Sequence, residues 1–196
     1  GQGVAMDAVR DGVARMARVP GRFEKVDLGQ DFTVVVDYAH TEDALQRVLG
    51  VARDLCRGRL ITVFGCGGDR DPGKRAPMGR VAARVSDLVI LTSDNPRGED
   101  PLAILSAIEQ GLREELAARA PDRPSAFSRQ PYLTLPDRRE AIERAVQMAE
   151  AGDLIVIAGK GHEDYQIVGD RRLSFDDRAA AREAIEQRLA RRARSA

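Results

Sequence analysis

The stretch "TVVVDYAHTEDALQRVLGVARDL" (residues 33–55) changes its hydrophobic period partway along. Residues 33–39 are mostly β-branched and apolar, which is typical of a buried strand. After them, apolar residues recur three and four positions apart, which predicts a helix with one buried face. The helical positions are Leu45, Val48, Leu49, Ala52 and Leu55. A buried strand followed directly by an amphipathic helix is the repeating unit of α/β proteins.

The same alternation continues toward the C-terminus. The predicted strands span residues 60–64, 88–93 and 154–159, and the predicted helices span residues 78–86, 101–120, 137–153 and 176–194. Asp137 is a candidate N-cap, and a hairpin is expected about Gly169 and Asp170. Because nearly continuous apolar strands alternate with helices, we expect an α/β fold with a mostly parallel sheet and helices on both faces.

Length and composition fit one domain with a short appendage. The chain has 196 residues and is 43% hydrophobic, enough for a substantial core. Lys plus Arg and Asp plus Glu both number 31, so no net charge draws nucleic acid or anionic lipid to the surface. No apolar run is long enough to cross a membrane, and no signal peptide is evident, so we expect a cytoplasmic protein.

Cysteine usage agrees with a reducing compartment. Cys56 and Cys66 lie outside any metal-ligand spacing, and we expect both to be ordinary buried thiols. The sequence predicts no metal site.

The first residues have a different character from the rest. Residues 3–17 carry a helical apolar pattern that ends at Pro20-Gly21. The chain therefore looks like a piece of a longer protein. We expect residues 1–21 to be the end of an upstream domain and a linker, and residues 22–196 to form the domain itself.

Polar loops follow four of the predicted strands. In open α/β sheets, ligands bind beyond the carboxyl ends of the strands, so parallel strands would bring these loops to one edge. The loops read "DYAHTED" (37–43), "GCGGDRDPGKR" (65–75), "SDNPRGEDP" (93–101) and "GKGHEDY" (159–165). Their shared richness in Gly, Asp, Arg, His and Asn predicts a binding site.

The second loop resembles a phosphate loop without its last residue. Gly68 and Lys74 have the Walker A spacing, but Arg75 stands where a Ser or Thr hydroxyl would bind magnesium. Two aspartates inside the loop would also repel a triphosphate. A solvated glycine turn is one alternative. We favour a loop that presents Arg70 to a carboxylate ligand.

The other candidates each have a structural alternative. "DNPR" could be a turn capped by Asp94. His40 and His162 could be hydrogen-bonded structural residues. Asp37 could pair with an arginine or bind a ribose hydroxyl, and Arg22 could be a surface charge.

Five motifs in order resemble the C-terminal domain of the Mur ligases, of the type that adds meso-diaminopimelate. They are "VPGRFE" (19–24), "VVVDYAHTED" (34–43), "VFGCGGDRDPGKR" (63–75), "TSDNPRGEDP" (92–101) and "IAGKGHEDYQ" (157–166). The resemblance implies a Rossmann-like domain that closes over a central domain. One departure is Glu42, where the family often has proline; glutamate also suits the first turn of a helix.

The resemblance also implies an activity for the whole ligase. ATP phosphorylates the D-glutamyl carboxylate of UDP-MurNAc-L-Ala-D-Glu, and an amine of meso-diaminopimelate then attacks the acyl phosphate. ATP and Mg²⁺ are held mainly by the central domain, and the UDP-linked dipeptide is bound through the other domains. The present chain would therefore contribute no catalytic residue and would be inactive alone.

Site residues follow from the resemblance position by position. Residues matching contacts to diaminopimelate are Arg70, Asp94, Asn95, Pro96, Arg97, Gly159 and Glu163. Residues matching the ATP side are Arg22, Asp37, Tyr38 and His40.

Selectivity for meso-diaminopimelate over lysine can also be argued from charge. meso-Diaminopimelate differs from lysine by a second carboxylate, and the guanidinium of Arg97 can bind a carboxylate through two parallel N–H bonds. The alternatives are a related ligase domain that adds lysine or, as in folylpolyglutamate synthases, glutamate. A stand-alone nucleotide-binding module is a third possibility.

Overall fold

A computed structural model describes residues 19–119 and 131–195 of the chain; the helix predicted over residues 3–17 lies outside them. The core is a six-stranded sheet in the order β1-β2-β6-β3-β4-β5. Its strands are β1 (Glu24–Val26), β2 (Thr33–Asp37), β3 (Leu60–Phe64), β4 (Leu88–Leu91), β5 (Tyr132–Thr134) and β6 (Leu154–Ala158). Only β1 runs antiparallel to its neighbour, so the mostly parallel sheet is confirmed.

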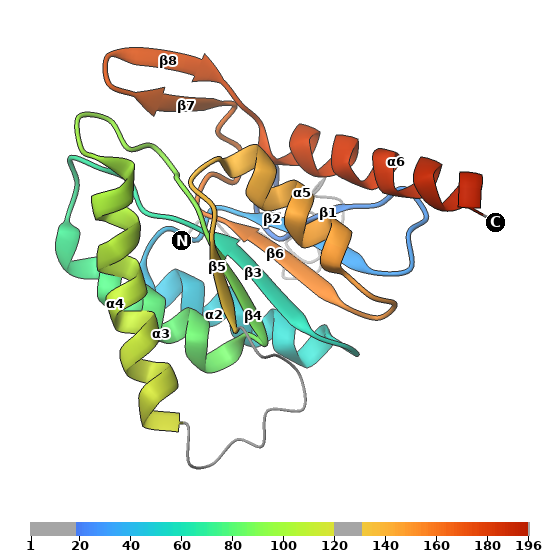
Figure 1. The fold of residues 1–196 in the computed structure, drawn as a ribbon, viewed down its shortest axis with the longest axis horizontal. Coiled ribbons are helices and arrows are strands. Elements are labelled where there is room, and N and C mark those ends of the chain that lie inside the picture. Colours follow the sequence, from blue (N-terminus) through green and yellow to red (C-terminus); the bar gives the residue numbers. More distant parts are fainter. Residues whose placement is uncertain (1–18, 120–130, 196) are drawn as a thin grey trace, which may run out of the picture.

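Helices cover both faces of this sheet (Figure 1). One face packs against α2 (Glu42–Leu55), α3 (Arg75–Val85) and α4 (Pro101–Arg119), and the other against α5 (Arg138–Met148) and α6 (Asp177–Ser195). Successive strand residues point to opposite faces, so Val35 belongs to the first core and its neighbours Val34 and Val36 to the second. The central strands are therefore mostly apolar and buried on both faces, as the sequence predicted.

Local sequence explains where the helices begin and how closely they pack. Thr41 caps α2 by accepting from the Ala44 N–H at 3.3 Å, and Asp137 caps α5 by accepting from the Glu140 N–H at 3.0 Å. A Cβ atom added to Gly79 in α3 would lie 2.1 Å from the Ile108 carbonyl oxygen of α4. Glycine therefore lets these two helices approach closely.

Two strands were not predicted. β1 and β5 have three residues each and lie at the two edges of the sheet. Their residues are largely exposed or partly exposed, so neither shows a continuous apolar run. Because these two edge strands are so short and partly exposed, the sequence shows no hydrophobic period that would identify them.

The predicted hairpin is present as β7 (Tyr165–Val168) and β8 (Arg171–Ser174), which form a separate two-stranded sheet. Gly169 supplies the left-handed turn conformation with φ 56°. Figure 1 shows the hairpin projecting from the end of the sheet, next to the long loop that precedes α4.

The two cysteines differ in burial. Cys66 is buried, and desolvation raises the pKa of its thiol to about 12. Cys56 is only partly buried, because it ends α2 at the domain surface, so the expectation of two buried thiols was wrong for Cys56. No helix within the described ranges is long and apolar enough to span a membrane.

Candidate ligand-binding site

Hydrogen bonds join the four polar loops at the carboxyl ends of the strands. The Gly159 N–H donates to the Asp37 carbonyl at 3.1 Å, which connects the ends of β6 and β2. The Gly68 N–H donates to the Asn95 carbonyl at 2.8 Å, which connects the loops after β3 and β4. The Asn95 amide donates to the Glu163 carboxylate at 3.0 Å, which connects the loops after β4 and β6. The convergence expected from a parallel sheet is present.

The glycines of residues 65–68 serve close packing between loops. A Cβ on Gly65 would lie 1.8 Å from the Thr92 carbonyl oxygen, and one on Gly68 would lie 1.9 Å from the Pro96 carbonyl oxygen. A Cβ on Gly67 would lie 2.8 Å from Nη1 of Arg97. These contacts account for the glycines of the near-Walker loop without a phosphate.

Arg97 lies beside this glycine loop in a left-handed backbone conformation, with φ 52°. Such a conformation costs a residue with a side chain about 1–2 kcal/mol. Two hydrogen bonds to the hairpin hold it: the Arg97 N–H donates to the Ile167 carbonyl at 3.0 Å, and its carbonyl accepts from the Gly169 N–H at 2.8 Å. Its Nη1 donates to the Gly68 carbonyl at 2.8 Å, so the guanidinium is directed along the loop.

Arg70 also lies beside Gly67, the glycine that Arg97 approaches. A Cβ on Gly67 would lie 3.8 Å from Cγ of Arg70. Arg70 is exposed, and its Nη1 donates to the carbonyl of Asp69 at 2.9 Å. The two predicted carboxylate-binding arginines are therefore neighbours, with Arg97 partly buried and Arg70 at the rim.

Arg75 has a role that sequence reasoning did not assign. Its Nη2 donates to both oxygens of Glu99 at 2.8 and 2.9 Å, and the Asp69 N–H also donates to Glu99 at 2.6 Å. These hydrogen bonds, first that from Arg75, hold the pKa of Glu99 below its usual value. The pair ties the loop after β3 to the loop after β4.

A buried polar cluster joins the residues predicted to meet the ligand. Asn95 Oδ1 accepts from Lys160 Nζ at 3.0 Å and from the Ile167 N–H at 3.0 Å, while its amide nitrogen donates to Glu163. Asp94 Oδ1 lies 3.3 Å from Lys160 Nζ. Lys160 is fully buried and was missed, because a lone lysine in a glycine loop carries no periodic signal for burial.

Gly159 and Pro96 complete the predicted amino-acid contacts. Gly159 has φ 118°, and a Cβ there would lie 3.7 Å from Oδ2 of Asp94, so its backbone passes directly over that carboxylate. Pro96 faces elsewhere: it lines a hollow of about 420 Å³ together with Phe175 and the hairpin residue Val168.

The residues predicted to face ATP form a second group beside the first. The Tyr38 ring lies 4.6 Å from the His40 ring and 5.2 Å from the His162 ring, measured between centroids. The Arg22 guanidinium lies over the Tyr38 ring at 5.0 Å. His162 was considered together with His40 in the sequence but was not assigned to the site; the structure places it with this group.

Asp37 accepts hydrogen bonds from the backbone. Its Oδ2 accepts from the Phe23 N–H at 2.7 Å and its Oδ1 from the Ala39 N–H at 2.8 Å, in place of the arginine considered from the sequence. A carboxylate has about four acceptor sites, so two remain. Asp37 thereby fastens the linker after Gly21 to the end of β2.

Two glycines bring the linker against the loop of residues 159–163. A Cβ on Gly21 would lie 2.1 Å from the His162 nitrogen, and one on Gly161 would lie 2.6 Å from Cβ of Tyr38. Both glycines have positive φ. The loop after β6 therefore contacts the linker and the nucleotide-side residues on one side and Asn95 on the other.

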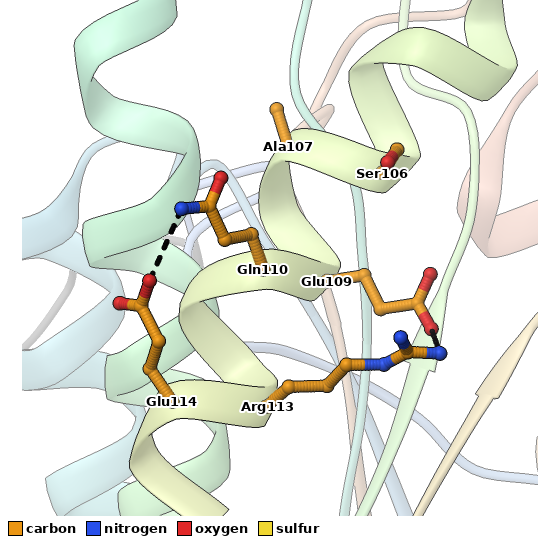
Figure 2. A pocket seen from close by; sticks show the side chains of 6 residues that line it. All are labelled: Ser106, Ala107, Glu109, Gln110, Arg113 and Glu114. Atoms are coloured by element: carbon orange, nitrogen blue, oxygen red, sulfur yellow. Dashed lines mark hydrogen bonds and ion pairs between the residues drawn. The ribbon is translucent and has the colours of Figure 1, made fainter.

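The pocket shown in Figure 2 lies elsewhere. It measures about 620 Å³ and is lined by residues of α4 alone. Its charged groups are paired: Arg113 binds Glu109 at 2.7 Å, and Glu114 binds Arg80 of α3 at 2.8 Å. Gln110 also donates to Glu114 at 3.1 Å (Figure 2). Because it lies along the middle of one helix and not at the strand ends, it is not the candidate site.

Comparison with known proteins gives a consistent result. The family model described as "Mur ligase, glutamate ligase domain" matches residues 21–161. UDP-N-acetylmuramoyl-L-alanyl-D-glutamate–2,6-diaminopimelate ligases from Solibacter usitatus and Syntrophomonas wolfei are 51% and 50% identical to this chain, over 94% and 96% of its length. The chain spans about a third of these relatives, 35% and 36% of their lengths.

Comparison with solved structures shows the same fold. A structure of a UDP-N-acetylmuramoyl-L-alanyl-D-glutamate–2,6-diaminopimelate ligase superposes with a TM-score of 0.75 at 41% identity, covering 95% of this chain and 35% of that one. E. coli FolC in complex with ADP superposes over 98% of this chain and 37% of its own, with a TM-score of 0.58 at 22% identity, which shows a shared fold alone.

Proposed function

Because this chain belongs to the Mur ligases through its glutamate ligase domain, we propose that it binds the incoming amino acid and closes over ATP in an ATP-dependent amide ligase. The proposed substrate is meso-diaminopimelate, which the ligase adds to UDP-MurNAc-L-Ala-D-Glu during peptidoglycan synthesis. One observation carries the proposal: Arg97 and Arg70 flank Gly67 in the loop after β3, and Asp94 and Glu163 gather about Asn95 and Lys160 at the ends of β4 and β6.

The charges of this cluster suit a doubly zwitterionic amino acid. meso-Diaminopimelate carries two carboxylates and two ammonium groups. Arg97 and Arg70 flank one glycine and offer donors to a carboxylate, while Asp94 and Glu163 offer acceptors to an ammonium. Lysine has only one carboxylate and would leave one arginine without its partner. A site built around a polar group commonly rejects the analogue lacking it by about 10⁴-fold.

The neighbouring group suits a nucleotide. Arg22 is exposed and can bind a phosphate, and Asp37 keeps free acceptor sites for ribose hydroxyls. Tyr38 and His40 offer ring faces beside them. ATP would phosphorylate the D-glutamyl carboxylate, and this chain would hold the attacking amino acid. We assign Mg²⁺, the UDP-linked dipeptide and most ATP contacts to the central and N-terminal parts of the ligase, and the reaction to the cytoplasm, where ATP and the UDP-linked precursor are made.

The test is product formation by the full-length ligase with meso-diaminopimelate, L-lysine or L-glutamate as the sole amino acid. We expect ATP-dependent amide formation with meso-diaminopimelate and a kcat/KM for lysine lower by about three orders of magnitude or more. Equal use of lysine would overturn the substrate assignment. This chain without its partner domains should form no product.

A further inference from the structure

We propose that Lys160 is a positioning residue of the amino-acid subsite, an inference that rests on the function proposed above. Its buried ammonium orients the Asn95 amide and the Glu163 carboxylate, and it offsets part of the negative charge of Asp94 and Glu163. Lys160 itself is fully buried, so it would act through these neighbours and not by touching the substrate.

The ammonium lies at the centre of the cluster. It donates to the Tyr165 carbonyl at 2.6 Å and to Asn95 Oδ1 at 3.0 Å. Two carboxylate oxygens lie slightly farther away, Asp94 Oδ1 at 3.3 Å and Glu163 Oε2 at 3.6 Å. One side chain thus joins β6, the loop after β4 and the start of the hairpin.

These contacts determine the orientation of the Asn95 side-chain amide. An ammonium has donors only, and the Ile167 backbone N–H is also a donor, so both need the amide oxygen. The amide nitrogen is then directed at Glu163, to which it donates at 3.0 Å. Without Lys160, one of the two donors to the Asn95 amide oxygen is lost, and Glu163 loses a nearby cation.

The charge balance gives the second part of the argument. Arg138 and Asp177, which lie beside the cluster, form a buried pair through two bonds of 2.7 Å and cancel each other. Lys160 then faces two carboxylates, Asp94 and Glu163, so these three side chains together carry one net negative charge; Arg97 and Arg70 lie at the glycine loop and are not part of this count. That charge matches a single ammonium group of the ligand.

Asp94 depends directly on Lys160. Its Oδ1 is buried and accepts no hydrogen bond from the described residues, although it lies close to Lys160. A buried carboxylate oxygen without a hydrogen bond needs another stabilising contact, and here the ion pair with Lys160 supplies it. Lys160 therefore holds the Asp94 carboxylate in place by charge, without a hydrogen bond to Oδ1.

The experiment uses the full-length ligase and the substitution Lys160→Met, which keeps chain length and removes the charge. We expect the KM for meso-diaminopimelate to rise about tenfold or more, because charged hydrogen bonds in the subsite are lost. The KM for ATP should change by less than about twofold, since the contacts of Lys160 lie on the amino-acid side. Lys25→Met is the matched control: this lysine is exposed on β1 and pairs with Asp27, so both KM values should stay unchanged.

A double-mutant cycle separates positioning from a general structural role. If Lys160 acts through Glu163, Lys160→Met combined with Glu163→Gln should raise the KM for meso-diaminopimelate by less than the product of the single effects. Strictly multiplicative effects, or equal increases in the KM for ATP and for the amino acid, would overturn the proposal. Melting curves establish that each variant is folded. Should Lys160→Met not fold, Lys160→Gln takes its place, because it keeps polar hydrogen-bonding groups without the charge.

Failure of this proposal differs from failure of the proposed function. If the unaltered ligase forms no product with meso-diaminopimelate, the function itself is wrong. If it does form product and folded Lys160→Met keeps the original KM for the amino acid, only the role of Lys160 is wrong.

Discussion

Arg97 combines a left-handed backbone with a guanidinium that turns along the glycine loop. Strain of this kind persists only where surrounding contacts hold it, and it concentrates at binding sites. Here the hairpin supplies those contacts, through Ile167 and Gly169. The position of the guanidinium is therefore set by the chain around it before any ligand arrives.

Arg97→Lys in the full-length ligase should lower kcat/KM for meso-diaminopimelate by about tenfold or more, because a point charge replaces a fork with two parallel donors. Arg171→Lys, at an exposed position of β8, is the matched control and should have no effect. Unchanged kinetics in both variants would mean that the Arg97 fork does not bind the ligand.

Asp37 stabilises the fold through two backbone hydrogen bonds, and we propose that it also binds the nucleotide. Asp37→Ala should lower the free energy of unfolding by about 1–3 kcal/mol, because the Phe23 and Ala39 N–H groups lose their acceptor. It should also raise the KM for ATP more than the KM for the amino acid. Chemical denaturation and steady-state kinetics measure the two effects. A kinetic effect confined to the amino acid would place the nucleotide at another loop.

At the scale of elements, the loop between β6 and β7 is the connector of the site. Strand β6 lies between β2 and β3 in the sheet, so its loop emerges between the nucleotide-side residues and the glycine loop. It contacts Tyr38 through Gly161 and Asn95 through Glu163. We therefore expect a shift of the linker at Gly21 to change the positions of residues in the amino-acid subsite.

Gly161→Ala should be clearly more destabilising than Gly169→Ala. Both glycines have nearly the same left-handed φ, 54° and 56°, so the conformational cost of about 1–2 kcal/mol is shared. Only at position 161 would the new Cβ clash, at 2.6 Å from the Tyr38 Cβ, whereas at position 169 it meets no described atom within 4 Å. Urea unfolding of the two variants measures the difference. Equal losses would show that the linker and the loop separate readily in solution.

The whole molecule is held partly by ion pairs whose carboxylates have lowered pKa values. A hydrogen bond from Arg192 lowers the pKa of Asp31, and hydrogen bonds from Arg75 and the Asp69 N–H lower that of Glu99. A carboxylate with a lower pKa in the folded state stabilises that state above its unfolded pKa, near 4, and loses this effect as the pH falls through the folded value. Both groups are near the surface, so salt weakens each contribution.

Unfolding in urea should therefore show constant stability between about pH 7 and pH 5 and a decrease below about pH 4. Glu99→Gln should make that decrease shallower, because one titrating pair is removed. Stability that rises on acidification would contradict the assigned direction of these pKa values.

Much of the fold was predictable because the central strands are locally distinct. β2, β3, β4 and β6 are nearly continuous apolar runs, and Asp137 precedes its helix with the usual capping pattern. β1 and β5 were missed because three residues are too few to show a hydrophobic period. The order of the polar loops was also predictable, and with it the candidate residues around Asp94 and Arg97.

The amino-acid chain alone dictated the α/β alternation, the polar loops at the strand ends and the likeness to the Mur ligases, because these are properties of neighbouring residues. Only folding decided that β6 inserts between β2 and β3, that Lys160 is buried among Asn95, Asp94 and Glu163, and that Arg75 pairs with Glu99. Burial and pairing of this kind depend on segments tens of residues apart. Local hydrophobic periodicity does not indicate which distant segment a strand or a charged residue will contact.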